Sequence, residues 1–165
     1  MRWLRFAILV LLVTVLQTSL VDVIAVTSLN IKPNLLLILL VFFAVHCSDT
    51  EVVITSFAIG FAADIIGPAM GPQIISFGLF GTLLADLRHF IAIKKIPYQS
   101  LVIFATGILA TALTFFLTFL KAEPMPSNIY TQLLWTPLYS AILGPFLFLP
   151  SEWWMRIRKR RIKRF

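Results

Sequence analysis

Two aspartates, Asp64 and Asp86, stand at the ends of long uncharged segments and are the residues most able to do chemistry. Two carboxylates at one depth could share a proton or act as general acid and general base. A charge at the centre of a lipid bilayer costs about 2.5–3.5 kcal/mol or more, so such a residue is a functional candidate. We expect Asp64 and Asp86 to lie at opposite ends of neighbouring helices, because each closes its own segment. They then cannot form a pair, and Asp64 has as possible partners loop amides, Lys32, Lys121 or another protein.

The other reactive residues lack the spacing of a catalytic or metal-binding motif. His46 and His89 have no acidic or sulfur neighbour at ligand spacing. Cys47 is the single cysteine, so it cannot form an intramolecular disulfide. The sequence contains neither a glycine-rich phosphate loop nor a nucleophile-elbow motif, and its seven acids are scattered along the chain. The sequence therefore predicts no enzyme, no metal site and no cofactor.

The elements that must position these residues follow from a very apolar composition. Of the 165 residues, 59% are hydrophobic and 13% are charged, and the mean hydropathy is +0.95. Soluble domains have about 45–50% apolar and about 25% charged residues, and one of this length could not bury so much apolar surface. The sequence predicts an all-α integral membrane protein, with one domain over 1–151 and a basic tail over 152–165.

Six apolar segments predict six transmembrane helices. A spanning helix needs about 20 residues, and the second to fourth segments are shorter. Polar flanks could extend them, a thinned bilayer could accommodate them, or they could pack inside the bundle. The third and fourth segments could instead form a re-entrant hairpin, and we interpret the first as an uncleaved helix rather than a signal peptide. Pro137, Pro145 and Pro150 predict kinks in or near the sixth helix, and Gly144-Pro145 is the most favoured position for a break. The predicted spans are 3–21, 35–46, 52–66, 74–87, 98–120 and 132–149.

The basic residues predict an orientation. With six spans, twelve of the fourteen Lys and Arg residues fall on one side, and only Lys32 and Lys121 fall on the other. Such a bias places both termini in the cytoplasm. Half of the basic residues lie in the tail, where we expect each to contribute about 1 kcal/mol to binding anionic lipids, and we expect no nucleic-acid binding. These residues are Arg156, Arg158, Lys159, Arg160, Arg161, Lys163 and Arg164.

Small and hydroxyl-bearing residues predict close packing between helices. Gly107, Thr111, Thr114 and Thr118 recur at spacings that place them on one stripe of the span 98–120. Small side chains let a second helix approach, and hydroxyls can form hydrogen bonds across the interface. We favour helix packing for this stripe over the alternative of a substrate path. A similar face in the span 52–66 comprises Ser56, Gly60 and Asp64.

The order of several short motifs resembles a known family. Lys32-Pro33-Asn34 precedes the leucine-rich second span, and a Gly-x-x-x-Asp-x-x-Gly pattern follows in the third. The chain closes with Leu-Gly-Pro-Phe, a double tryptophan and the basic tail. This layout resembles the rod shape-determining protein MreD family over nearly the full length. The residues that match the family pattern are Pro33, Asn34, Gly60, Asp64, Gly67 and Gly71.

The resemblance implies a non-catalytic scaffold of the cell-elongation complex in the bacterial cytoplasmic (inner) membrane, supporting lateral peptidoglycan synthesis and rod shape. Implied partners are MreC, the glycosyltransferase RodA with its transpeptidase, and the MreB cytoskeleton. The family is similar in fold to the substrate-binding subunits of energy-coupling-factor vitamin transporters. We expect the six matching residues to contribute to docking of MreC or to the structure itself. The alternative function is a substrate-binding subunit of a vitamin-type transporter, and a lipid-modifying enzyme is a more distant one.

Overall fold

The computed structural model describes residues 3–19, 33–67, 70–88, 96–124 and 127–155. Within these ranges all regular structure is helical, which confirms the predicted all-α class. Each predicted span contains one helix, and the last helix runs further toward the C-terminus than predicted. The helices are α1 (Trp3–Ser19), α3 (Leu35–His46), α4 (Asp49–Ile66), α5 (Pro72–Leu87), α6 (Ile96–Leu120) and α7 (Ile129–Met155).

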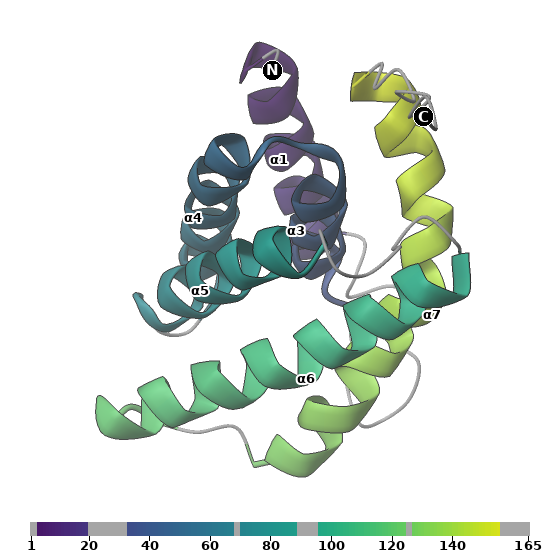
Figure 1. The fold of residues 1–165 in the computed structure, drawn as a ribbon. Helices are drawn as coiled ribbons and strands as arrows, with labels where there is room; N and C mark the ends of the chain where they lie inside the picture. The colour runs from purple at the N-terminus through teal and green to yellow at the C-terminus, as the bar shows by residue number, and fades with distance from the viewer. Residues whose placement is uncertain (1–2, 20–32, 68–69, 89–95, 125–126, 156–165) are drawn as a thin grey trace.

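The helix α3 forms the centre of the molecule. Its residues from Leu36 to Ala44 are all at most 3% exposed, and α3 contacts each of the other five helices. A helix that is apolar on every side has no face for a polar environment, so it packs best where protein surrounds it. The other helices form a ring around it in the order α1, α4, α5, α6, α7, and α7 contacts α1 again (Figure 1). Of the possibilities for the short second segment, the structure shows packing inside the bundle.

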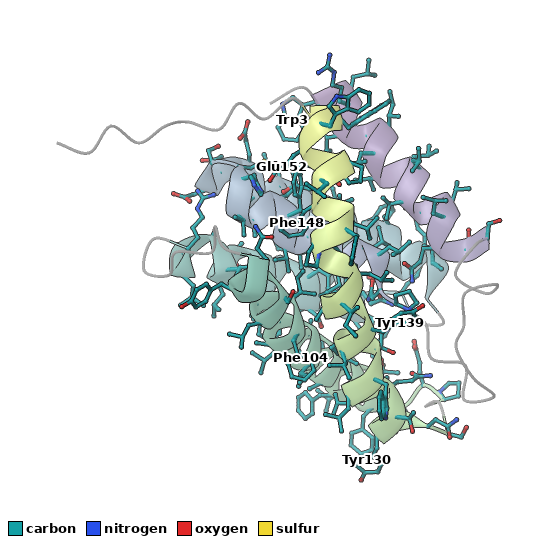
Figure 2. The ribbon with its side chains drawn as sticks, turned by 90° about the vertical axis from the view of Figure 1, so that its right-hand side faces the viewer. Trp3, Phe104, Tyr130, Tyr139, Phe148 and Glu152 are labelled. Atoms are coloured by element: carbon teal, nitrogen blue, oxygen red, sulfur yellow. The ribbon has the colours of Figure 1, made fainter. Side chains whose placement is uncertain are left out.

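The first and last helices meet at one end of the molecule. The indole Nε1 of Trp154 in α7 donates to the backbone carbonyl of Arg5 in α1 at 3.4 Å. At the same end, His46 Nε2 of α3 lies 3.3 Å from Glu152 Oε1 of α7. Figure 2 shows Trp3 beside the end of α7 that carries Glu152, with Tyr130 at the opposite end. Both described chain ends thus lie at the same end of the molecule.

The outer surface of the ring is apolar. Large side chains on the outward faces of α1, α4, α5, α6 and α7 are about half exposed or more, among them Leu11, Phe61, Leu79, Phe116 and Phe146. A monomeric soluble protein rarely exposes so extensive an apolar surface. Two helices, Tyr98–Leu120 in α6 and Ile129–Trp154 in α7, are long and apolar enough to cross a membrane.

The helix α7 continues through Pro137, Pro145 and Pro150, so it does not end at Gly144-Pro145, and the predicted kinks stay a prediction. A proline removes one backbone hydrogen bond, but a helix inside a bundle is held by its neighbours as well. A Cβ on Gly144 would lie 2.2 Å from Ile103 Cδ1, which shows how closely α6 supports α7 at this point. Packing against α6 therefore supports a continuous α7 at Gly144-Pro145, where the local sequence alone favours an interruption.

Candidate functional site

The carboxylate of Asp64 holds the turn between α4 and α5. It lies in the last turn of α4 and is 2% exposed. Its Oδ2 accepts from the backbone N–H groups of Gly71 at 2.9 Å and Ile74 at 3.0 Å, and its Oδ1 accepts from the N–H of Gln73 at 3.0 Å. The first amides of a helix have no partner within the helix and carry a partial positive charge. A buried carboxylate at that position therefore caps α5 and satisfies its own hydrogen-bonding capacity.

Local sequence explains why the chain turns here. Gly71 adopts φ of 114°, a backbone region that residues with a Cβ rarely occupy, and it is the N-cap of α5. Pro72 follows at the first helical position, where its missing N–H costs no hydrogen bond. The glycine and proline thus direct the first turn of α5 back toward Asp64.

Glycines allow α4 and α5 to pack closely behind this turn. A Cβ on Gly60 would lie 2.8 Å from the Cα of Ile74, so the two backbones almost touch. Further along, Gly78 faces the ring of Phe57, and Gly81 faces the side chain of Ser56. The predicted face of Ser56, Gly60 and Asp64 is therefore the buried interface with α5. Because Gly60 has no side chain, the start of α5 lies close enough to α4 for Asp64 to reach its amides.

A lysine holds the same turn from outside. Lys121, just after α6, donates from Nζ to the carbonyl of Met70 at 2.6 Å and pairs with Glu123 at 3.1 Å. The side chain of Met70 is 66% exposed beside these contacts. Of the predicted partners of Asp64, the structure shows backbone amides, while Lys121 contacts the carbonyl of Met70, and Lys32 lies outside the described residues. Asp64 and Lys121 thus hold the described residues of the turn, Met70 and Gly71.

The residues Pro33 and Asn34 lie at a second helix start, that of α3. Asn34 Oδ1 accepts from the N–H of Leu37 at 3.0 Å, and the N–H of Asn34 donates to Ser140 Oγ at 2.8 Å. Gln17 bridges the same start, donating to the carbonyl of Pro33 at 3.1 Å and accepting from the N–H of Leu35 at 2.7 Å. Side chains from α1 and α7 therefore satisfy the polar groups of a helix end inside the bundle.

The stripe of α6 mediates helix packing. A Cβ on Gly107 would lie 2.8 Å from Pro137 Cβ and 2.9 Å from Leu37 Cδ2, so the glycine admits both α7 and α3. Thr114 donates across the interface with α5 to Ser76 Oγ at 3.0 Å. Thr118 is buried and bonds to the carbonyl of Thr114 at 2.8 Å, and Thr111 is half-buried on the same helix.

Arg88 was not among the predicted site residues, yet it holds the opposite end of the α4–α5 hairpin. Its guanidinium donates to the carbonyls of Ala44, at 3.1 Å, and Cys47, and it forms an ion pair with Asp49. Arg88 thus joins the carbonyl end of α3 to the first turn of α4. The partial negative charge at the end of α3 favours the guanidinium, and the partial positive charge at the start of α4 favours the carboxylate of Asp49. In the sequence Arg88 contributes only to the count of basic residues, because its partners lie about 40 positions earlier.

Two reactive side chains lie near that end. Burial raises the pKa of the Cys47 thiol to about 11. His46 Nδ1 lies 2.9 Å from the carbonyl of Phe42, while Glu152 of α7 approaches the other ring nitrogen. Within the described ranges no three His, Cys, Asp or Glu side chains gather as a metal site would require. The basic tail residues 156–164 lie outside the described residues.

Comparison with known proteins identifies the family. Residues 1–158 match the family described as rod shape-determining protein MreD. The chain belongs to the MreD family. The match confirms the resemblance predicted from the short motifs. MreD is a family of membrane proteins with a role in rod shape determination. No curated protein and no solved structure matches the chain.

The structure places the residues that match the MreD pattern in two separate groups. Gly60, Asp64, Gly67 and Gly71 surround the turn between α4 and α5, whereas Pro33 and Asn34 lie at the start of α3. Both groups hold helix starts in place by satisfying backbone groups. Asp86, in the last turn of α5, is exposed and far from Asp64, which confirms that the two carboxylates form no pair.

Proposed function

We propose that this chain is a non-catalytic, multi-pass scaffold of the bacterial cell-elongation complex. In this proposal it docks MreC and, with it, RodA and its transpeptidase and the MreB cytoskeleton. Membership of the MreD family supports the role in rod shape. The functional candidates inside the bundle support a scaffold, because Asp64 and Arg88 use their charges to hold backbone groups rather than to face a substrate.

A location in the cytoplasmic membrane with both termini in the cytoplasm agrees with the geometry. The ring turns apolar side chains outward, and lipid is the environment that accepts them. The start of α1 and the end of α7 lie side by side, and Arg5 and Arg88 lie at that same end of the bundle. The predicted excess of basic residues on this side marks it as the cytoplasmic one.

The docking surface that we propose is the turn between α4 and α5, at the opposite end of the bundle. The observation that carries the proposal is the triple hydrogen bond from this turn and α5 to Asp64. Asp64 holds the amides of Gly71, Gln73 and Ile74, and Lys121 binds the carbonyl of Met70, so a partner that contacts these residues meets backbone already held in place, at a small ordering cost. The exposed side chain of Met70 supplies an apolar contact there.

Copurification with MreC tests the docking surface. Met70→Glu places a charge on the exposed side chain and leaves the contacts of its carbonyl intact, so we expect recovery of MreC to fall at least tenfold while the fold is kept. Charge reversal in Asp64→Lys should abolish assembly, because it removes the cap of α5. Asp86→Asn, at the other end of α5, is the matched control and should recover MreC normally.

Depletion tests the role itself. We expect rod-shaped cells that lose this protein to become round, and expect the wild type and Asp86→Asn, but not Asp64→Lys, to restore the rods. Cells that keep their shape would contradict the scaffold. A vitamin retained stoichiometrically by the purified protein would instead support the transporter function.

A further inference from the structure

The hairpin of α4 and α5 turns a short apolar face outward, with polar groups at both ends. At one end lie Asp49, paired with Arg88, and the exposed Asp86. At the other end the ammonium of Lys121 bonds the carbonyl of Met70. Between these ends the exposed side chains are apolar: Val53, Ile54, Phe57, Phe61, Ile65, Ile75, Leu79 and Leu83.

The height of this face follows from helix geometry. From Val53 to Ile65 the helix rises about 18 Å at 1.5 Å per residue. The whole of α4 has 18 residues and α5 has 16, which correspond to about 27 Å and about 24 Å. Any tilt makes the height along the bilayer normal smaller still. A typical hydrocarbon core is about 30 Å thick, so the hairpin is too short for it.

The other side of the ring has ordinary dimensions. The helices α6 and α7 contain 25 and 27 residues, which correspond to about 37 Å and about 40 Å. Exposed apolar side chains on α7 extend from Tyr130 to Trp153. Figure 1 shows α6 running obliquely to α7, so the height of α6 is smaller than its length. The apolar belt is therefore tall over α7 and short over α4 and α5.

The composition of the short face favours lipid over a partner helix. Helix partners in membranes meet through small residues, and the glycines of this hairpin, Gly60, Gly78 and Gly81, face inward between α4 and α5. The outward side chains are bulky aromatic and branched groups, which suit fluid acyl chains. We propose that the α4–α5 hairpin thins the bilayer beside it, so that this protein prefers membranes with short acyl chains. This inference rests on the membrane placement proposed above.

Stability in vesicles of graded thickness tests the inference. The full-length protein is reconstituted in phosphatidylcholines with monounsaturated chains of fourteen to twenty-two carbons, and its thermal unfolding midpoint is measured. We expect the highest midpoint with fourteen or sixteen carbons and a fall of about 5 °C or more toward twenty-two carbons, because mismatch lowers stability.

A taller variant makes the test specific to the hairpin. Thr50→Leu with Asp86→Leu extends the apolar face at its polar end, so its optimum should move to longer chains. Thr82→Leu adds an apolar side chain within the existing height and should leave the optimum unchanged. An optimum at eighteen carbons or more in the wild type, or one that both variants move equally, would overturn the inference. Release of the wild type from native membranes by alkaline carbonate would instead overturn the membrane placement.

Discussion

Asp64 and Arg88 each bind backbone groups at a helix end. Asp64 binds amides at the start of α5, and Arg88 binds carbonyls at the end of α3. In each case the side-chain charge opposes the partial charge of the helix end. Inside a bundle these contacts matter more than at a surface, because a helix end without partners cannot be solvated there.

Asp64→Ala should therefore destabilise the protein strongly. The change removes three hydrogen bonds to a charged acceptor and leaves their donors unsatisfied, so we expect a loss of about 3 kcal/mol or more in the free energy of unfolding. Asp64→Asn keeps one acceptor oxygen and should lose less. Denaturant-induced unfolding in detergent micelles measures both losses.

The matched control for this prediction is Asp86→Ala. Asp86 is exposed, so its removal should change the free energy of unfolding by no more than about 0.5 kcal/mol. Equal losses for Asp64→Ala and Asp86→Ala would refute the capping role of Asp64.

Cys47 gives a prediction with a pH dependence. Burial raises the pKa of its thiol from 9.0 to about 11, so the folded protein holds this proton more tightly than the unfolded chain does. Its contribution to stability is complete below about pH 9 and is lost as the pH rises toward about 11. At pH 8 we expect maleimide to modify Cys47 about 100-fold more slowly than an exposed thiol, because the thiolate is the nucleophile.

The reference for this labelling is the double variant Cys47→Ala, Thr50→Cys, which carries one thiol on the exposed face of α4. Mass spectrometry follows both reactions. Equal rates in the folded proteins would show that Cys47 is accessible.

At the scale of elements, close backbone contact between α4 and α5 makes the cap possible. A Cβ at Gly60 would meet the backbone of Ile74, which cannot move without shifting the first turn of α5. A Cβ at Gly67 would meet the end of the Gln73 side chain, which can move aside, and would lie 3.3 Å from the backbone carbonyl of Ala63. The two glycines of one motif therefore tolerate substitution differently.

Gly60→Ala should cost about 1–3 kcal/mol, because the helices must separate and the hydrogen bonds to Asp64 must lengthen. Gly67→Ala should cost less than about 1 kcal/mol. Unfolding midpoints of the two variants in the same micelles check this ranking. The reverse order would contradict the packing described for the hairpin.

At the scale of the whole molecule, the two described chain ends lie together at the end that carries Arg5 and Arg88. Green fluorescent protein fused after Phe165 should therefore fluoresce in cells, and alkaline phosphatase fused there should be inactive. A phosphatase fusion made after Glu123, beyond α6, should be active instead. Activity of the phosphatase at the C-terminus would contradict the orientation and the docking surface that depends on it.

The sequence alone predicted the helical class, the position of each helix and the family. Local patterns suffice for these properties, because apolar segments and their polar flanks determine where a helix begins and ends. The packing role of the stripe that carries Thr114 and the close packing of the Gly60 face also followed from helical periodicity, although the partner helices did not. Short motifs in a fixed order were enough to indicate the MreD family.

Only the tertiary structure decided which contacts these residues make. It showed that α3 is the centre, that Asp64 binds amides rather than Lys121, that Arg88 joins three helices and that α7 continues through Pro145. Such features depend on neighbours distant in the chain, and a local pattern carries no information about which surfaces meet. The charges could be located from the sequence, but their partners exist only once the helices have packed.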